Sequence, residues 1–362
     1  MKFIDEYRDP LLAGKLLERI ARLALSAGRQ MTIMEVCGTH TVAIGRFGIR
    51  NLLPENIRLI SGPGCPVCVT SIHDVDSALF LAGIPGVIFA TFGDMLRVPG
   101  SQGLTLQRMK ARGADIRVIP SAVDCIELAE ENMTKEVVLM GIGFETTSPT
   151  VASVVRDCKE KGIKNFSVFS VHKVIPPALK VLVDDSALNI DGFLCPGHVS
   201  TIIGAEPYTF VAEAGSAAVI TGFEPVDILE GIFMILGQIK EHKKTVAIQY
   251  RRGVNPEGNP RAKELLNDVF KPAATSWRGL GMIPDSGLYF REAYRNFDAR
   301  LRFDIPPLES VEVTGCRCGD ILRGILSPRE CPLFKSVCTP LNPLGPCMVS
   351  TEGTCSAYYR YH

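Results

Sequence analysis

Short apolar segments alternate with segments of helical periodicity over the first two thirds of the chain. Each apolar segment runs into a turn marked by Gly, Pro or Thr, and then into a helix. This alternation predicts parallel sheets with helices on their faces. We predict eight strands in two series of four: Met31–Val36, Ile57–Ser61, Gly86–Thr91 and Ile116–Pro120, followed by Val137–Gly143, Phe166–Val171, Ile190–Leu194 and Ala217–Thr221.

The two series of strands indicate an α/β fold with two doubly wound parallel-sheet lobes that face a cleft. Residues 29–130 form the first predicted lobe and residues 131–250 the second. A helix within residues 1–28 precedes them, and we expect it to pack on the C-terminal domain. The stretch Arg251–Pro260 is rich in Gly, Pro and Asn and marks a boundary. Residues 251–362 lose the alternating rhythm and predict a mainly helical and irregular domain organised by cysteines.

The overall charge of the chain is balanced. Lys and Arg together number 39, and so do Asp and Glu, so bulk charge predicts neither nucleic acid nor a membrane surface as partner. No uncharged apolar run reaches the roughly 18–20 residues of a membrane span. Residues 1–10 are rich in charge and lack the apolar stretch of a signal peptide. We therefore expect a cytoplasmic protein.

Twelve cysteines are many for a chain expected in a reducing compartment, where clustered thiols more often bind metal or carry out redox chemistry. Six of them lie between Cys316 and Cys355. Four thiolates from one region suit an iron–sulfur cube. Zinc also accepts four thiolates, but the paired C-x-x-C knuckles of zinc ribbons are absent here. Because six cysteines exceed four ligands, the remaining two could form a redox-active dithiol beside the cluster.

A second motif, Cys65-Pro66-Val67-Cys68, follows a predicted strand and precedes a helix that begins near Ser71. A C-x-x-C unit suits a reversible disulfide or half of a metal site, and a helix N-terminus lowers the pKa of a nearby thiol. The alternative is a Gly-Pro turn that holds two ordinary thiols.

The segment Cys37-Gly38-Thr39-His40 also stands at the carboxyl end of a predicted strand. A thiolate with an imidazole three residues away could be a nucleophile–base pair, as in cysteine hydrolases, or a metal site. The alternative is a buried cysteine followed by a helix-capping threonine.

Two further motifs follow strands of the second series, one around Glu145 and the other around His198. Either side chain could transfer a proton, and His198 could also bind metal. In the alternative reading, Thr146 and Thr147 are helix caps and His198 is a hydrogen-bonded turn residue. Ligands of open α/β sheets bind outside the carboxyl ends of the strands. Two facing lobes would therefore gather these groups in one cleft: Cys37, Cys65, Cys68, Glu145 and His198.

These strings together resemble the signature motifs of the HypD family of nickel–iron hydrogenase maturation factors. The resemblance extends over essentially the whole chain. It rests on CGTH at Cys37–His40, GPGCPVC at Gly62–Cys68, GFETT at Gly143–Thr147, PGHVS at Pro196–Ser200, and the C-x14-C-x6-C-x16-C spacing of Cys316, Cys331, Cys338 and Cys355.

The resemblance implies a tight complex with HypC, on which an iron ion receives two cyanides and one carbon monoxide before delivery to the hydrogenase large subunit. The cyanide would come from HypE, which carries it as a thiocyanate made with HypF. The resemblance also implies a scaffold with redox activity rather than a turnover enzyme. Two alternatives remain at this stage, an iron–sulfur-dependent thiol–disulfide reductase and a cysteine hydrolase.

The resemblance also implies roles for particular residues. Cys37 would bind the iron, and Cys65 and Cys68 would bind iron or exchange electrons. We expect His40, Glu145 and His198 to act in the chemistry. Thr39, Thr146 and Thr147 are expected to contact the iron-bound group. A 4Fe–4S cluster would be held by Cys316, Cys331, Cys338 and Cys355, with Cys318 and Cys347 as the neighbouring dithiol.

Overall fold

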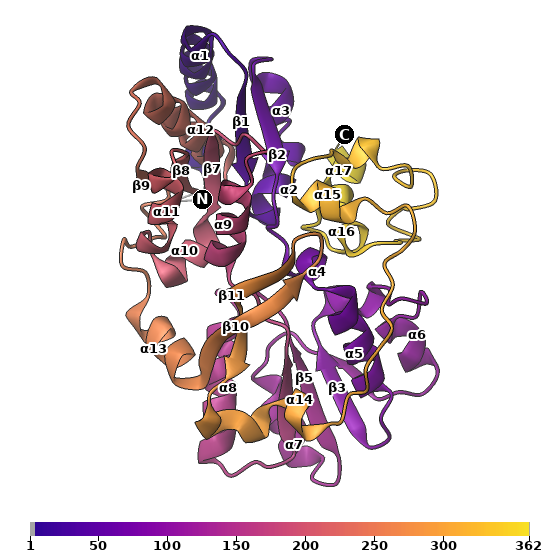
Figure 1. Ribbon diagram of the computed structural model, residues 1–362. Helices are drawn as coiled ribbons and strands as arrows, with labels where there is room; N and C mark the ends of the chain where they lie inside the picture. Colours follow the sequence, from indigo (N-terminus) through magenta and orange to yellow (C-terminus); the bar gives the residue numbers. More distant parts are fainter. Residues whose placement is uncertain (1–3, 362) are drawn as a thin grey trace.

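The computed structural model describes residues 4–361 and shows two parallel sheets with a cysteine-rich C-terminal segment beside them (Figure 1). The five-stranded sheet has the order β2-β1-β7-β8-β9, and the four-stranded sheet has the order β4-β3-β5-β6. All neighbouring strands within these two sheets are parallel. The strands are β1 (Met31–Glu35), β2 (Ile57–Ser61), β3 (Val87–Thr91), β4 (Ile116–Val118), β5 (Glu136–Gly141), β6 (Phe166–Ser170), β7 (Gly192–Pro196), β8 (Ala217–Thr221) and β9 (Val246–Ile248).

The sheets confirm the predicted α/β class, but the predicted grouping of their strands is wrong. Strand β1 pairs with β7, with Ile33 opposite Gly192, and this pairing draws β1 and β2 into the sheet of β7 to β9. Strands β3 to β6 form the other sheet and are inserted between β2 and β7. A period-two apolar pattern identifies a strand but not its neighbour, so the order of the strands along the chain was a poor guide to their grouping.

Helices cover both faces of each sheet, because the strand residues alternate between two apolar layers. On β1, Ile33 faces the layer that contains α1 and α12, whereas Met34 faces the C-terminal segment, where its Cε lies 2.8 Å from the position of a Cβ on Gly324. On β5, Leu139 packs with α7 and α8, and Met140 packs with α5. The helices of the two lobes are α1 (Pro10–Ala27), α2 (Gly38–Arg46), α3 (Ile49–Leu52), α4 (Pro66–Val69), α5 (Ile72–Ala82), α6 (Leu106–Ala111), α7 (Asp124–Glu131), α8 (Ser148–Glu160), α9 (Ile175–Asp184), α10 (Gly197–Ile203), α11 (Thr209–Glu213) and α12 (Pro225–Lys240).

Helix α1 packs on α12 of the five-stranded lobe, so the expectation that it packs on the C-terminal domain is wrong. Its buried residues Leu16, Ile20 and Ala24 share an apolar cluster with α12, and the Arg19 guanidinium lies 4.0 Å above the ring of Phe233. The apolar stripe of α1 packs against α12, on one face of the five-stranded sheet. The C-terminal segment lies on the opposite side of this sheet (Figure 1).

The C-terminal third contains an antiparallel hairpin that the sequence pattern did not predict. Its strands are β10 (Phe270–Trp277) and β11 (Gly281–Phe290). Pro272 and Gly287 weaken the strand signal in these segments. The remaining elements are short helices: α13 (Pro260–Val269), α14 (Ala299–Arg302), α15 (Cys318–Leu322), α16 (Pro346–Val349) and α17 (Thr354–Tyr361), with 3-10 turns η1 (Asp5–Arg8), η2 (Gly93–Arg97), η3 (Glu206–Tyr208), η4 (Glu292–Phe297) and η5 (Pro328–Glu330).

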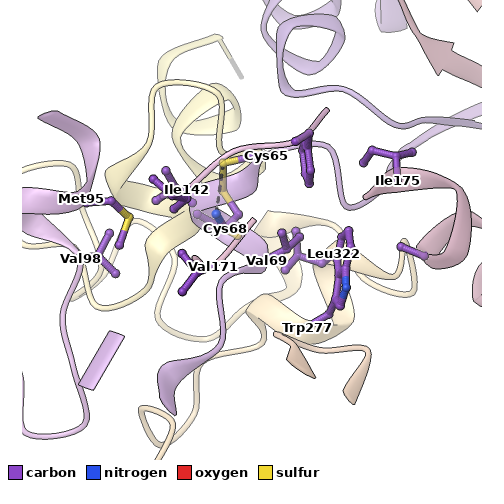
Figure 2. Close-up of a cluster of buried hydrophobic side chains, with 14 of the residues drawn as sticks. Cys65, Cys68, Val69, Met95, Val98, Ile142, Val171, Ile175, Trp277 and Leu322 are labelled. Atoms are coloured by element: carbon purple, nitrogen blue, oxygen red, sulfur yellow. Dashed lines mark hydrogen bonds between the residues drawn. A yellow bond between two sulfur atoms is a disulfide. The ribbon is translucent and has the colours of Figure 1, made fainter. Parts of the chain in front are cut away.

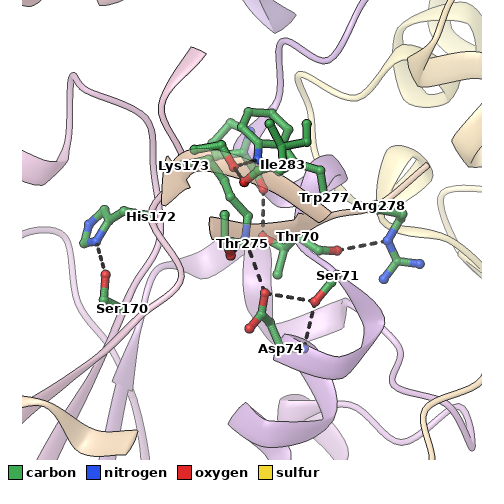
Figure 3. Close-up of polar contacts among 12 residues, drawn as sticks. Thr70, Ser71, Asp74, Ser170, His172, Lys173, Thr275, Trp277, Arg278 and Ile283 are labelled. Atoms are coloured by element: carbon green, nitrogen blue, oxygen red, sulfur yellow. Dashed lines mark hydrogen bonds and ion pairs between the residues drawn. The ribbon is translucent and has the colours of Figure 1, made fainter. Parts of the chain in front are cut away.

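A buried ion pair ties the hairpin to the four-stranded lobe (Figure 3). Lys173 is fully buried after β6, and its Nζ lies 2.9 Å from Thr275 Oγ1 and 3.4 Å from Asp74 Oδ2. Arg300 binds the other oxygen of Asp74 at 3.0 Å. Because a buried charge is costly without its partners, these contacts fix the hairpin and α14 against α5. Within residues 4–361, no helix combines the length and the apolarity that crossing a bilayer requires.

The packing of α1 predicts that substitution by Ala destabilises the protein at a buried position of this helix but not at an exposed one. Replacing the fully buried Ile20 by Ala should lower the free energy of unfolding by about 2–5 kcal/mol, because it opens a cavity against α12. The matched control is Leu25→Ala, since Leu25 is 79% exposed, and it should change stability by less than about 0.5 kcal/mol. Urea-induced unfolding measures both, and equal losses would contradict this placement of α1.

Candidate functional site

The predicted site residues follow strands at the points where the two sheets reverse their winding. In the five-stranded sheet, β1 and β7 are neighbours, and the strands that follow each of them lie on opposite sides. Strands β3 and β5 have the same relation in the four-stranded sheet. Ligand crevices of open α/β sheets form at such points. Cys37 follows β1, His198 follows β7 and Glu145 follows β5.

A pocket of about 350 Å³ opens between these strand ends. The five-stranded lobe contributes Cys37 and His198 to its wall, and the four-stranded lobe contributes Thr147. The pocket thus brings together part of the predicted set: Cys37, Thr39, Thr146, Thr147 and His198. His40, Glu145, Cys65 and Cys68 are not among the side chains that line it.

Two glycines allow the loops of this pocket to approach one another. A Cβ on Gly64 would collide with the backbone of Cys37, so the GPGC loop can reach Cys37 only with glycine at this position. A Cβ on Gly38 would lie 2.5 Å from Glu352 Cβ, so glycine there leaves room for the C-terminal segment. Gly38 and Gly64 therefore allow three backbone segments to come close together around Cys37.

Glu352 is a pocket residue that sequence reasoning missed. Its Oε1 accepts a hydrogen bond from Thr39 Oγ1 at 2.7 Å. The turn that carries it is anchored by Ser350, whose Oγ donates to Asp94 Oδ2 at 2.9 Å. Glu352 lies in an irregular segment without periodic pattern, and the only signal in the sequence is its position between Cys347 and Cys355.

The Cys37 thiol is buried, with 7% of the residue exposed. Burial, and next the carboxylate of Glu352, raise the pKa of Cys37 to about 12, although backbone amides of Thr39 and His40 partly oppose this shift. The free thiol is therefore protonated near neutral pH. A metal ion that binds this sulfur must displace the proton, which makes its binding dependent on pH.

The His40 ring does not form the predicted pair with the Cys37 thiol. His40 is fully buried, and its Nε2 donates to the carbonyl oxygens of Thr221 at 3.1 Å and Gly222 at 2.9 Å. Its Nδ1 has no hydrogen-bond partner in the part of the chain that the structure describes. Burial lowers the pKa of His40 to about 4, so the ring is neutral. In this position the ring anchors α2 to the loop after β8.

His198 lies on the pocket wall, and its ring stacks on Phe223 with centroids 3.9 Å apart. Burial lowers its pKa, while the carboxylate of Glu352 opposes that shift. A neutral imidazole in the wall can donate one hydrogen bond and accept another.

Glu145 lies behind the pocket, between the lining residues Phe144 and Thr146. Its Oε1 accepts the backbone N–H of Ile175 at 2.9 Å, and its Oε2 has no partner among the described residues. Burial raises the pKa of Glu145 to about 7. The carboxyl group can therefore hold or release a proton near neutral pH.

Cys65 and Cys68 form a disulfide in the apolar layer where the two lobes meet the C-terminal segment (Figure 2). Pro66, between them, lines the pocket. On the other side, Cys68 Sγ lies 4.0 Å from the carbonyl oxygen of Pro346, the residue before Cys347. The C-x-x-C unit thus lies between the pocket and the C-terminal cysteines.

The six C-terminal cysteines lie close to one another. The sulfur atoms of Cys318 and Cys347 are 2.7 Å apart. Burial, and then the neighbouring thiols Cys318, Cys331 and Cys355, raise the pKa of Cys316 to about 12. Cys338 Sγ accepts the Leu344 amide at 3.4 Å.

Residues 4–361 contain no group of three or more ligands arranged for a single metal ion. The chemistry of the donor set nevertheless fits an iron–sulfur cube. In such a cube each of the four thiolates binds a different iron, so the four cysteine sulfurs need not converge on one point. Backbone amides that donate hydrogen bonds to these sulfurs stabilise the thiolates that hold the cluster.

The fold and the pocket define a class of protein: a two-lobed α/β protein whose pocket is completed by a cysteine-rich C-terminal segment. The chain matches the HypD family, described as the "Hydrogenase formation hypA family", over residues 12–362. It belongs to this family.

Relatives align with the whole chain. Hydrogenase maturation factor HypD2 of Bradyrhizobium diazoefficiens is 46% identical over 369 residues, which cover 100% of this chain and 97% of that protein. The hydrogenase expression/formation protein HupD of Azotobacter chroococcum is 47% identical over 368 residues, with the same coverage of 100% and 97%. Hydrogenase maturation factor HypD of Escherichia coli is 45% identical over 368 residues, which cover 100% of this chain and 98% of that protein.

The environment of Glu145 predicts a pH-dependent stability. Its folded pKa of about 7 exceeds the ordinary value of 4.5, so its contribution to stability falls as pH rises from 4.5 to about 7 and then stays level. Glu145→Gln keeps the acceptor for Ile175 and removes the charge. It should raise the free energy of unfolding by about 1–3 kcal/mol at about pH 8 and have little effect at about pH 5.

Denaturant unfolding at both pH values measures this difference. The exposed Glu264→Gln on α13 is the control and should leave the pH dependence unchanged. An equal effect of Glu145→Gln at both pH values would contradict the placement of this carboxyl group.

Proposed function

We propose that this chain acts in hydrogenase maturation as a scaffold. Together with HypC, it holds an iron ion while the ion receives two cyanides and a carbon monoxide, before delivery to the large subunit of a nickel–iron hydrogenase. The observation that carries this proposal is the buried Cys37 thiol in a pocket shared by both lobes and the C-terminal segment. A maturation scaffold needs a site of this kind, since the iron must be held firmly and then released.

Cys37 is the ligand that this chain offers to the iron. Cyanide and carbon monoxide bind low-spin ferrous iron, and such electron-rich iron favours soft thiolate ligands. A single thiolate leaves the remaining iron positions open to the diatomic ligands and to a ligand from HypC. The walls of the pocket exclude bulk water from the bound iron.

Polar side chains around Cys37 can position the diatomic ligands. Thr146, Thr147 and His198 line the pocket and can donate hydrogen bonds to the nitrogen atoms of iron-bound cyanide, whereas Thr39 lines it with its hydroxyl proton directed to Glu352. Glu352 accepts from Thr39 and so fixes the direction of that hydroxyl. Glu145, behind this wall, can supply or take up a proton as the ligands arrive.

The cyanide is proposed to come from HypE, which carries it as a thiocyanate made with HypF. Its release takes two electrons: the carbon–sulfur bond breaks, cyanide passes to the iron, and the carrier sulfur leaves as a thiolate. Cys65 and Cys68 as a dithiol supply two electrons when they close to a disulfide and release two protons. Their place beside Pro66 of the pocket wall supports this role.

The C-terminal cysteines are proposed to hold a resident 4Fe–4S cluster through Cys316, Cys331, Cys338 and Cys355. When bound, such a cluster supplies electrons one at a time. The sulfur atoms of Cys318 and Cys347 lie 2.7 Å apart, and Cys347 follows Pro346, whose carbonyl oxygen is 4.0 Å from Cys68 Sγ. A dithiol at this place can exchange with a neighbouring disulfide.

A second candidate function is a thiol–disulfide reductase that needs the same cluster. The Cys65–Cys68 disulfide beside Pro346 favours it. This function needs no iron on Cys37, so the presence or absence of iron bound to Cys37 distinguishes the two candidate functions.

Cys37→Ser should abolish the iron-bound cyanide and carbonyl bands in the infrared spectrum of the anaerobically purified complex with HypC. An alkoxide does not form near neutral pH, and low-spin iron prefers sulfur. The visible absorbance of the cluster should remain. Cys158→Ser is the control, because Cys158 is buried on α8 within the four-stranded lobe, and it should keep the bands. Bands of wild-type intensity in Cys37→Ser would overturn the proposal and favour the reductase.

Replacing Cys331 by Ala tests the cluster. The substitution should reduce the iron content and the visible absorbance, and it should expose residues 310–360 to protease, because four thiolates pin a region with little regular structure. Cys125→Ala on α7 is the matched control and should keep both the iron and the protection. Unchanged iron and protection in Cys331→Ala would exclude this residue as a ligand.

A further inference from the structure

A groove of about 480 Å³ lies between the four-stranded lobe and the cysteine-rich segment, away from the Cys37 pocket. One wall comes from the region of η2 and α6, including Arg97, Thr105 and Arg108. The other wall includes Val313, Leu341 and Leu344. The maturation chemistry proposed above makes no use of this groove.

The loop that forms the second wall has the cysteine sulfurs on its inner side. The Leu344 backbone N–H donates to Cys338 Sγ at 3.4 Å. At the next residue, the position of a Cβ on Gly345 lies 3.2 Å from Cys316 Sγ. The loop that lines the groove therefore also contacts two of the clustered sulfurs.

The groove combines positive charge with exposed apolar surface. Two of the side chains that line the groove, Arg97 and Arg108, are cationic. No carboxylate lines the groove. On the facing loop, Leu341 is 94% exposed, the highest value among the large apolar side chains reported as exposed within residues 4–361. Arg97 donates to the carbonyl oxygen of Pro340, so the cationic wall is fixed against the apolar loop.

We infer that this groove docks a small acidic electron-transfer protein of the 2Fe–2S ferredoxin type. Opposite charge guides such partners to a redox site, and a small mixed surface allows rapid release after each transfer. Two donor molecules each lose one electron, and the Cys65–Cys68 disulfide takes up both. Its S–S bond breaks, and two protons from water complete the two thiols. The inference rests on the proposed redox role of the C-terminal cysteines.

Binding of a plant-type 2Fe–2S ferredoxin to the anaerobically purified chain tests the inference by calorimetry at low and high ionic strength. Leu341→Asp and Arg108→Glu should each weaken binding by about tenfold or more, and high salt should weaken wild-type binding. Because both side chains lie at the surface of the groove, neither substitution should alter the fold. Matched controls on α1 are Leu25→Asp and Arg22→Glu, which should bind as the wild type does.

Equal binding by wild type and both groove variants, or equal weakening by the α1 controls, would overturn the inference. Loss of the HypC complex in the groove variants would also overturn it, since the groove would then belong to the assembly partner. The infrared bands of the HypC complex separate this result from the proposed function. If the infrared bands are present but the groove variants bind ferredoxin as the wild type does, only the docking site is excluded. If the bands are absent but the groove variants alone bind ferredoxin more weakly, only the iron-scaffold function is excluded.

Discussion

The close approach of three backbone segments at Cys37 is the constraint on which the site depends. The GPGC loop reaches Cys37 because Gly64 has no side chain, and the C-terminal turn reaches Gly38 for the same reason. Glu352 then binds Thr39, and the loop after β5 closes the pocket from the other lobe. Neither lobe alone holds more than part of this wall, so the pocket exists only when all three parts of the chain are assembled.

This shared wall explains why most ionisable groups around the pocket are held neutral. Burial keeps the proton on Cys37, raises the pKa of Glu145 to about 7, and keeps His40 uncharged. A metal ion that binds Cys37 must therefore have enough affinity for sulfur to displace the thiol proton.

The sequence predicted local structure well because local structure follows local pattern. The apolar runs placed β1, β2 and β6 to within a residue or two, and the turn motifs after β1 and β7 placed Cys37 and His198 at one sheet edge. The pairing of β1 with β7 could not be predicted, since it depends on how whole layers of helices pack. Glu352 was missed because it reaches the pocket from a segment without periodicity, and the hairpin was missed because Pro272 and Gly287 interrupt its pattern.

The insertion of β3 to β6 between β2 and β7 has a consequence for synthesis. As the chain leaves the ribosome, β1 and β2 emerge first but lack the neighbour that β7 provides. The four-stranded lobe is complete earlier, because all of its strands are contiguous. The first-made strands must therefore wait, with an open edge beside β1, until the inserted lobe has been made, and such late long-range pairing is slow. Cys37, which follows β1, is thus translated before the inserted lobe and enclosed only after β7 has been made.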